Sequence, residues 1–173
     1  METWYAIDNA VQVDSPALLV YRDRIVQNID RALHFVHGVE DRLRPHIKTN
    51  KCKEVCQLMM DKGIKKFKCA TIAEAELLGV IGAEDVLLAY QPVGPKVDRF
   101  LQLSKAFPNT HFSCLVDNSD AAQAISSKSL ALGLLTTIYI DINVGMGRTG
   151  VVLEDLERLF MDKAESDRHD KML

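Results

Sequence analysis

The 173-residue sequence has no apolar run approaching the ~20 residues that a membrane-spanning helix needs. Its first residues, METWYAIDNAVQVDS, contain acids and no basic stretch leading into an apolar run, so they do not resemble a secretory signal. It also has no strong excess of either charge, because 21 Lys and Arg residues are interspersed with 24 Asp and Glu residues. We therefore expect a cytoplasmic protein that binds neither nucleic acid nor a membrane.

The sequence also has no pattern typical of metal binding or redox chemistry. Its cysteines follow no C-x-x-C spacing and two lie in apolar runs, so we interpret them as reduced, buried side chains. His34, His37, His111 and His169 have no partner at the spacing of metal ligands. We therefore assign neither a metal nor a redox role to the cysteines, which are Cys52, Cys56, Cys69 and Cys114.

The chain instead alternates short apolar runs with amphipathic segments. Runs rich in β-forming residues occupy residues 17–20, 45–48, 66–71, 85–90, 111–117 and 137–143. After the first run, Ile25, Ile29 and Leu33 recur on one helical face, which predicts a helix over residues 22–37. This repeated order predicts parallel strands joined by right-handed crossovers, an α/β fold.

Residues typical of helix ends follow the same alternation. Thr71 with Glu74 forms a T-x-x-E capping box, Gly94-Pro95 opens a helix, and Asn118 offers another N-cap. Two architectures remain, an open doubly wound sheet or a (β/α)8 barrel of the TIM type. A closed barrel needs eight strands and typically ~250 residues, so a barrel would be present here only as about six βα units, followed by a helix over residues 153–164.

A basic cluster lies at the carboxyl end of the second expected strand. Alternate residues of a strand share a face, so Arg44, His46 and Lys48 are expected to point into one space. Active sites of barrel folds lie at this end, and a lysine beside other cations is more readily a free amine that attacks an aldehyde. From spacing alone, a solvent-exposed Lys48 and an idle, packed His46 remain alternatives.

A glycine-rich loop follows the sixth expected strand. Gly145, Gly147 and Gly150 permit a tight loop, and Arg148 presents a planar cation suited to an anionic oxygen. A dinucleotide-binding fingerprint would follow the first strand and have an acid about 20 residues further on, so that interpretation is disfavoured. A plain turn remains the alternative. Thr71, after the third strand, is either a helix cap or also a lining residue of a site.

Four segments together resemble the D-threonine aldolase and D-serine dehydratase group of fold-type III pyridoxal-phosphate (PLP) enzymes. They are residues 15–20 (SPALLV), 44–51 (RPHIKTNK), 70–76 (ATIAEAE) and 141–151 (DINVGMGRTGV), in matching order and spacing over roughly residues 10 to 152. Alanine racemases share this barrel but tend to have a lysine in place of Asp141. This departure favours the aldolase and dehydratase group, while the role of Asp141 itself stays open.

The resemblance implies a site. Lys48 would bind the aldehyde of PLP and later act as acid or base at the amino acid Cα, and the cofactor would serve as electron sink. His46, Arg148, Thr71 and Asn143 would line the cofactor, although the role of Asn143 stays open. The group's divalent-metal ligands lie in a C-terminal β domain, so they are absent from this stretch.

The resemblance also implies an organisation of the chain. Residues 1–14 would form an N-terminal arm, residues 15–164 a partial PLP-binding (β/α) barrel, and residues 165–173 a polar tail, with the C-terminal β domain absent. For the full-length form, a homodimer is the expected assembly.

The expected function is that of the N-terminal part of a PLP-dependent lyase acting on D-β-hydroxy-amino acids. A D-threonine aldolase-like activity would cleave the substrate to glycine and an aldehyde. The alternatives are a D-serine dehydratase-like ammonia-lyase and an inactive fragment or non-catalytic PLP-binding protein. We expect the isolated 173-residue chain to be inactive.

Overall fold

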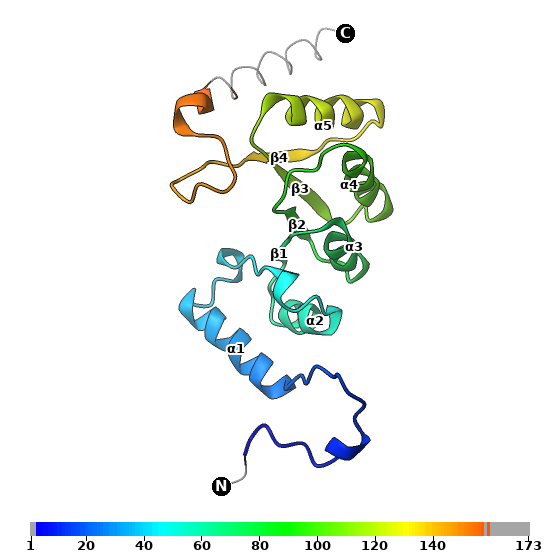
Figure 1. The fold of residues 1–173 in the computed structure, drawn as a ribbon, viewed down its shortest axis with the longest axis vertical. Coiled ribbons are helices and arrows are strands. Elements are labelled where there is room, and N and C mark those ends of the chain that lie inside the picture. Colours follow the sequence, from blue (N-terminus) through cyan, green and yellow to red (C-terminus); the bar gives the residue numbers. More distant parts are fainter. Residues whose placement is uncertain (1–2, 158, 160–173) are drawn as a thin grey trace.

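A computed structural model describes residues 3–157 and 159 of the chain (Figure 1). Within these residues, one parallel sheet of 4 strands runs in chain order. The strands are β1 (Lys66–Cys69), β2 (Asp85–Leu88), β3 (His111–Val116) and β4 (Thr137–Ile140). The helices are α1 (Arg22–Phe35), α2 (Lys53–Asp61), α3 (Ile72–Val80), α4 (Pro95–Ala106) and α5 (Ser119–Ala131), with 3₁₀ helices η1 (Ala10–Gln12), η2 (Glu40–Arg42) and η3 (Ile47–Thr49). The predicted α/β alternation is thus confirmed.

Helices α3, α4 and α5 lie along one side of the sheet (Figure 1). On this side Phe67 of β1, Val86 of β2 and Cys114 of β3 are fully buried, and they share one apolar core with Leu78 of α3 and Phe100 of α4. Burying each large apolar side chain contributes about 1.5–3 kcal/mol, so the contacts between these helices and the sheet stabilise the fold.

The opposite face of the sheet carries the alternate strand residues. By register, one row across this face is Lys68, Leu87, Ser113 and Thr137. This row mixes polar and apolar side chains, unlike the helix-covered face. No helix of the described chain packs over this opposite face (Figure 1). This is the face that lines the interior when such a sheet curves into a barrel.

The predicted helix ends are confirmed. The Oγ1 atom of Thr71 accepts a hydrogen bond from the backbone N–H of Glu74 at 3.1 Å, and Oδ1 of Asn118 accepts one from Ala121 at 2.9 Å. Gly94 precedes α4 with φ +56°, and the proline after it occupies the first turn. These caps are local, since each acceptor and donor lie within one helical turn.

Two of the expected strands do not form within the described residues. Pro45 accepts a hydrogen bond from Lys68 at 2.8 Å, and His46 makes a single bridge to β1 before the chain turns into η3. Pro45 has no N–H to extend a ladder. Residues 17–20 form no strand, and Leu18 is 87% exposed, because β-forming side chains make a strand only where a neighbouring strand pairs with them.

The last expected helix is present as far as the structure describes it. Residues 153–157 and 159 are helical, and the remainder of the expected helix, with the polar tail at 165–173, lies outside the described residues. Among the described helices, none has the length and apolar character required to cross a membrane.

Candidate functional site

Lys48 lies in η3, the short helix that follows the bridge between His46 and β1. Its side chain is exposed at the carboxyl end of this segment. The backbone N–H of Lys48 donates a hydrogen bond to Nδ1 of His46 at 3.3 Å, and the Thr49 hydroxyl donates one to the His46 carbonyl at 3.1 Å. His46 therefore caps the turn that carries Lys48.

The protonation state of His46 agrees with this capping role. Burial lowers the pKa of His46, and the nearby charges of Lys68 and Lys48 lower it further, while Glu74 acts in the opposite direction. As the acceptor of a hydrogen bond, Nδ1 carries no proton, so the neutral ring holds its proton on Nε2. The lowered pKa favours the neutral ring that this hydrogen bond to Nδ1 requires.

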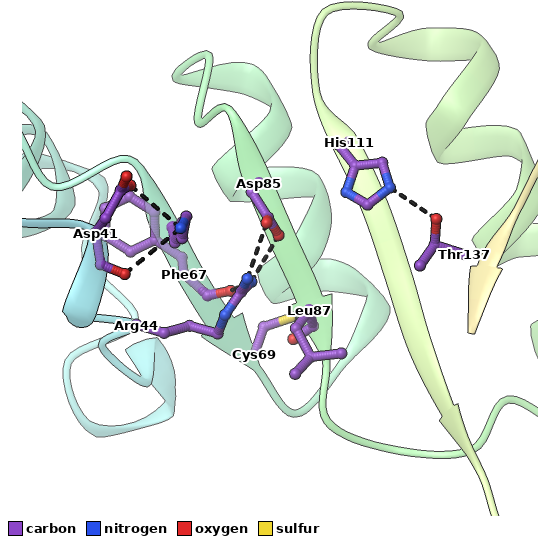
Figure 2. Close-up of polar contacts among 9 residues, drawn as sticks. Asp41, Arg44, Phe67, Cys69, Asp85, Leu87, His111 and Thr137 are labelled. Atoms are coloured by element: carbon purple, nitrogen blue, oxygen red, sulfur yellow. Dashed lines mark hydrogen bonds and ion pairs between the residues drawn. The ribbon is translucent and has the colours of Figure 1, made fainter. Parts of the chain in front are cut away.

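The expected grouping of Arg44 with His46 and Lys48 is wrong. Figure 2 shows the Arg44 side chain directed across β1 toward Asp85, the first residue of β2. Its guanidinium binds both carboxylate oxygens of Asp85, at 2.6 and 2.8 Å, and this bond raises the pKa of Arg44. Because Asp85 lies at the amino end of the sheet, Arg44 is neutralised there and does not add a free cation beside Lys48.

The glycine-rich loop closes on the end of β4. Asn143 N donates to the Val151 carbonyl and Val151 N donates to the Asp141 carbonyl, both at 2.9 Å, so residues 144–150 form a loop with joined ends. A Cβ on Gly150 would lie 2.6 Å from the Asn143 nitrogen, and Gly150 has φ +99°. Only glycine permits this closure.

The side chain of Asn143 shapes the inside of the loop. Its Oδ1 atom accepts hydrogen bonds from the backbone N–H groups of Gly145 and Gly147, at 3.1 and 3.0 Å. Gly150 N donates to Oδ2 of Asp117 at 3.4 Å, which joins the loop to the end of β3. Asn143 therefore orders the loop, and its contact with a cofactor stays a prediction.

Arg148 projects from this ordered loop with an exposed side chain. In the described part of the chain it makes no hydrogen bond and no ion pair. An arginine without a partner retains all its donors for an anionic group, and the loop sets the position of its backbone. Lys48 thus follows the segment bridged to β1 and Arg148 follows β4, the strands at opposite edges of the sheet.

A cavity of about 240 Å³ lies at the carboxyl ends of β2 and β3. Tyr90, Gln91, Asp117, Asp141 and Thr149 line it, and Oε1 of Gln91 accepts a hydrogen bond from Asp117 N at 2.8 Å. Sequence reasoning did not single out the first three of these. Their position at or just after the end of an expected strand was the available signal.

Thr71 lines a second cavity, of about 380 Å³, between the starts of α3 and α4. Lys96 and Arg99 of α4 also line it, and Lys96 Nζ lies 5.4 Å from the centre of the Tyr90 ring. The hydroxyl of Thr71 is already engaged in capping α3. A contact between Thr71 and a cofactor stays a prediction.

Residues 20–170 match the family model described as "Alanine racemase, N-terminal domain". The chain is 30% identical over 148 residues to the D-threo-3-hydroxyaspartate dehydratase of Delftia sp. (strain HT23), covering 86% of this chain and 38% of that protein. It is 26% identical over 145 residues to a D-threonine aldolase of Arthrobacter sp., covering 83% of this chain and 38% of that protein. The chain thus spans about 38% of the length of these curated relatives.

Solved structures also resemble this chain. The D-threonine aldolase of Filomicrobium marinum superposes with a TM-score of 0.74 at 28% identity, over 83% of this chain and 38% of that one. The Delftia dehydratase superposes with a TM-score of 0.73 at 30% identity, over 82% and 37%. The parallel sheet and its helices are therefore part of the α/β barrel predicted from the sequence, and the chain belongs to the alanine racemase N-terminal domain family.

Proposed function

We propose that the chain is the N-terminal part of a PLP-dependent lyase that acts on D-β-hydroxy-amino acids, with Lys48 as the residue that binds the cofactor aldehyde. The observation that carries the proposal is the presentation of Lys48, exposed on a turn capped by His46. The two curated relatives support the substrate class, because threonine and 3-hydroxyaspartate, the amino acids in their names, both carry a β-hydroxyl group.

The residues present fit the cofactor. Lys48 offers an exposed primary amine for the aldehyde, and Arg148 offers a guanidinium without a partner in the described chain for an anionic oxygen. His46, which caps the turn of Lys48, would line the cofactor. When bound, PLP withdraws electrons from the Cα of an amino acid.

The chain's own residues would then have distinct roles. Lys48 would move the proton at Cα as an acid or a base, because an amine can give or take a proton there. Arg148 would orient the bound molecule from the opposite edge of the sheet, and Asn143 keeps its loop in shape. His46 holds the turn of Lys48. Orientation of this kind is a major part of catalysis.

Cleavage and dehydration are the two candidate reactions. Retro-aldol cleavage needs a base at the β-hydroxyl, whereas dehydration needs an acid there. We propose D-threonine aldolase-like cleavage first, and the dehydratase relative at 30% identity supports dehydration as the second candidate. We further propose that residues 1–14 form an N-terminal arm and that residues 15–164 form part of the barrel. The divalent-metal ligands and a C-terminal β domain would then belong to the full-length form.

The test is product analysis. The full-length form is incubated with PLP and either D-threonine or D-threo-3-hydroxyaspartate, because the isolated chain is expected to be inactive. Lys48→Ala and the control Lys53→Ala, which removes an exposed lysine of α2, are assayed beside it. Glycine and an aldehyde indicate cleavage, whereas ammonia and a keto acid indicate dehydration, and either activity should vanish only in Lys48→Ala. If the full-length form binds PLP at Lys48 without any product, it is a non-catalytic PLP-binding protein, and the lyase assignment is wrong.

A further inference from the structure

The turn that carries Lys48 ends in an unfavourable backbone conformation. Asn50 N and Lys51 N both donate to the carbonyl of Ile47, at 3.1 and 2.8 Å, and the Ile47 side chain is fully buried. Lys51 has φ +49°, in the left-handed region that residues other than glycine rarely adopt. Such a conformation persists only where surrounding contacts hold it.

Glu74 of α3 provides a contact of this kind. Its side chain is only 6% exposed, and Oε2 accepts a hydrogen bond from Ala70 N at 2.7 Å. The other oxygen, Oε1, lies 3.7 Å from Nζ of Lys51. The Lys51 side chain is 66% exposed, so water screens the pair from one side, while the buried carboxylate gives it a fixed partner.

Glu74 also acts on the other flank of the turn. Its negative charge raises the pKa of His46, in opposition to Lys68, Lys48 and burial. The carboxylate therefore lies within electrostatic reach of both His46 and Lys51, the residues on either side of Lys48. No other described carboxylate affects His46 in this way.

We propose that Glu74 is a positioning residue for Lys48: through its ion pair with Lys51 it holds the turn of residues 47–51 against the start of α3. This inference rests on the proposed function, since the position of Lys48 matters because its amine must reach the cofactor aldehyde. A lysine side chain has four rotatable bonds, so the place of its backbone decides how often the amine reaches its target.

The alternative is that Glu74 only caps α3. Lys51→Met separates the two, because it removes the cation, keeps a side chain of similar length, and leaves the cap between Thr71 and Glu74 intact. Glu74→Gln retains an acceptor for Ala70 N but loses the charge. Lys51→Arg should retain the ion pair with Glu74. Lys53→Met and Glu76→Gln are matched controls, since both side chains are exposed and lie outside this pair.

Two measurements test the proposal. The first is hydrogen exchange of the amides of residues 47–52 without cofactor; the second is the rate of covalent capture of PLP at Lys48, trapped by borohydride and located by mass spectrometry. In Lys51→Met and Glu74→Gln we expect faster amide exchange and an about threefold to tenfold slower capture of PLP. The double variant should capture PLP no more slowly than either single variant, and Lys51→Arg should behave like the unsubstituted protein.

The outcomes separate this inference from the proposed function. If the unsubstituted protein captures no PLP at Lys48, the proposed function fails, and the exchange of residues 47–52 still decides the role of Glu74. If exchange and capture in Lys51→Met equal those of Lys53→Met, the positioning role is wrong even where PLP binds. Should Glu74→Gln fail to fold, Lys51→Met alone carries the test, because it leaves α3 unchanged.

Discussion

The guanidinium of Arg44 and the carboxylate of Asp85 form a two-point ion pair, with Nη1 to Oδ1 at 2.6 Å and Nη2 to Oδ2 at 2.8 Å (Figure 2). Nη1 also donates to the Phe67 carbonyl at 3.4 Å. One side chain therefore joins the segment before Lys48 to both β1 and β2. This matters because that segment has only one bridge to the sheet, at His46.

Removing Arg44 should loosen this segment. Arg44→Met leaves the partly buried Asp85 carboxylate without its partner, and we expect the free energy of unfolding to fall by about 2 kcal/mol. In Arg44→Lys the free energy of unfolding should fall by about half as much, because an ammonium cannot bind both carboxylate oxygens in the same way. Urea denaturation measures both. The control Lys62→Met removes an exposed pair with Asp30 and should change the free energy of unfolding by less than about 0.5 kcal/mol. A urea midpoint of Arg44→Met equal to that of the unsubstituted protein would contradict this prediction.

The cap that His46 provides should be sensitive to acid. Burial, Lys68 and Lys48 lower the pKa of His46 below its ordinary 6.5, so the unfolded chain binds this proton at a higher pH than the folded chain. Its contribution to stability is therefore full above 6.5 and is lost as the pH falls below that value.

His46→Asn provides the matched comparison for this effect. An asparagine oxygen can replace Nδ1 as acceptor for Lys48 N but does not titrate. Unfolding free energies of the two proteins, measured from about pH 7.5 to about pH 5.5, should show the unsubstituted protein losing stability relative to His46→Asn as the pH falls. A difference that stays constant over this range would mean that His46 has the same pKa in both states.

How much the sequence predicts depends on the distance between partners along the chain. The caps of Thr71 and Asn118 were predictable because donor and acceptor are three residues apart. The pairing of Arg44 with Asp85 spans 41 residues, and no local pattern indicates it. Strand character alone therefore predicted that Arg44 lies beside Lys48. Its actual partner, Asp85, is brought within reach by the pairing of β1 with β2.

The strands illustrate the same limit. Residues 17–20 and 45–48 have β-forming side chains, yet ladder formation depends on a neighbour and on free N–H groups, which Pro45 lacks. Within the site, the glycine spacing at residues 145–150 predicted a tight loop. The structure shows why glycine is needed there, because Gly150 lies against the backbone of Asn143. The left-handed Lys51 could not be anticipated, because its conformation comes from the fold around it.

The loop that carries Arg148 should tolerate alanine at one glycine and not at another. Gly147 has φ +63° with open space around it, so Gly147→Ala should cost about 1 kcal/mol from backbone strain alone. Gly150→Ala adds a clash with Asn143 and should cost about 3 kcal/mol. Urea denaturation and hydrogen exchange of residues 143–151 measure the two. Equal effects at both positions would show that the close approach does not constrain the loop.

Arg148 should matter for the cofactor and not for folding. Because it has no partner among the described residues, Arg148→Met should leave the free energy of unfolding without PLP within about 0.5 kcal/mol of the original value. The dissociation constant for PLP should rise about tenfold, which corresponds to about 1.4 kcal/mol. Arg31→Met, at an exposed position of α1, is the control. An unchanged affinity in Arg148→Met would remove Arg148 from the site.

The central claim is that Lys48 binds the cofactor aldehyde, and the direct measurement is the location of the covalent adduct. The protein is mixed with PLP, reduced with borohydride, digested, and the modified lysine is identified by mass spectrometry. We predict one dominant adduct at Lys48, with equal yield in Lys53→Ala and none at this site in Lys48→Ala. Modification spread evenly over the exposed lysines, or its absence from Lys48, would contradict the account.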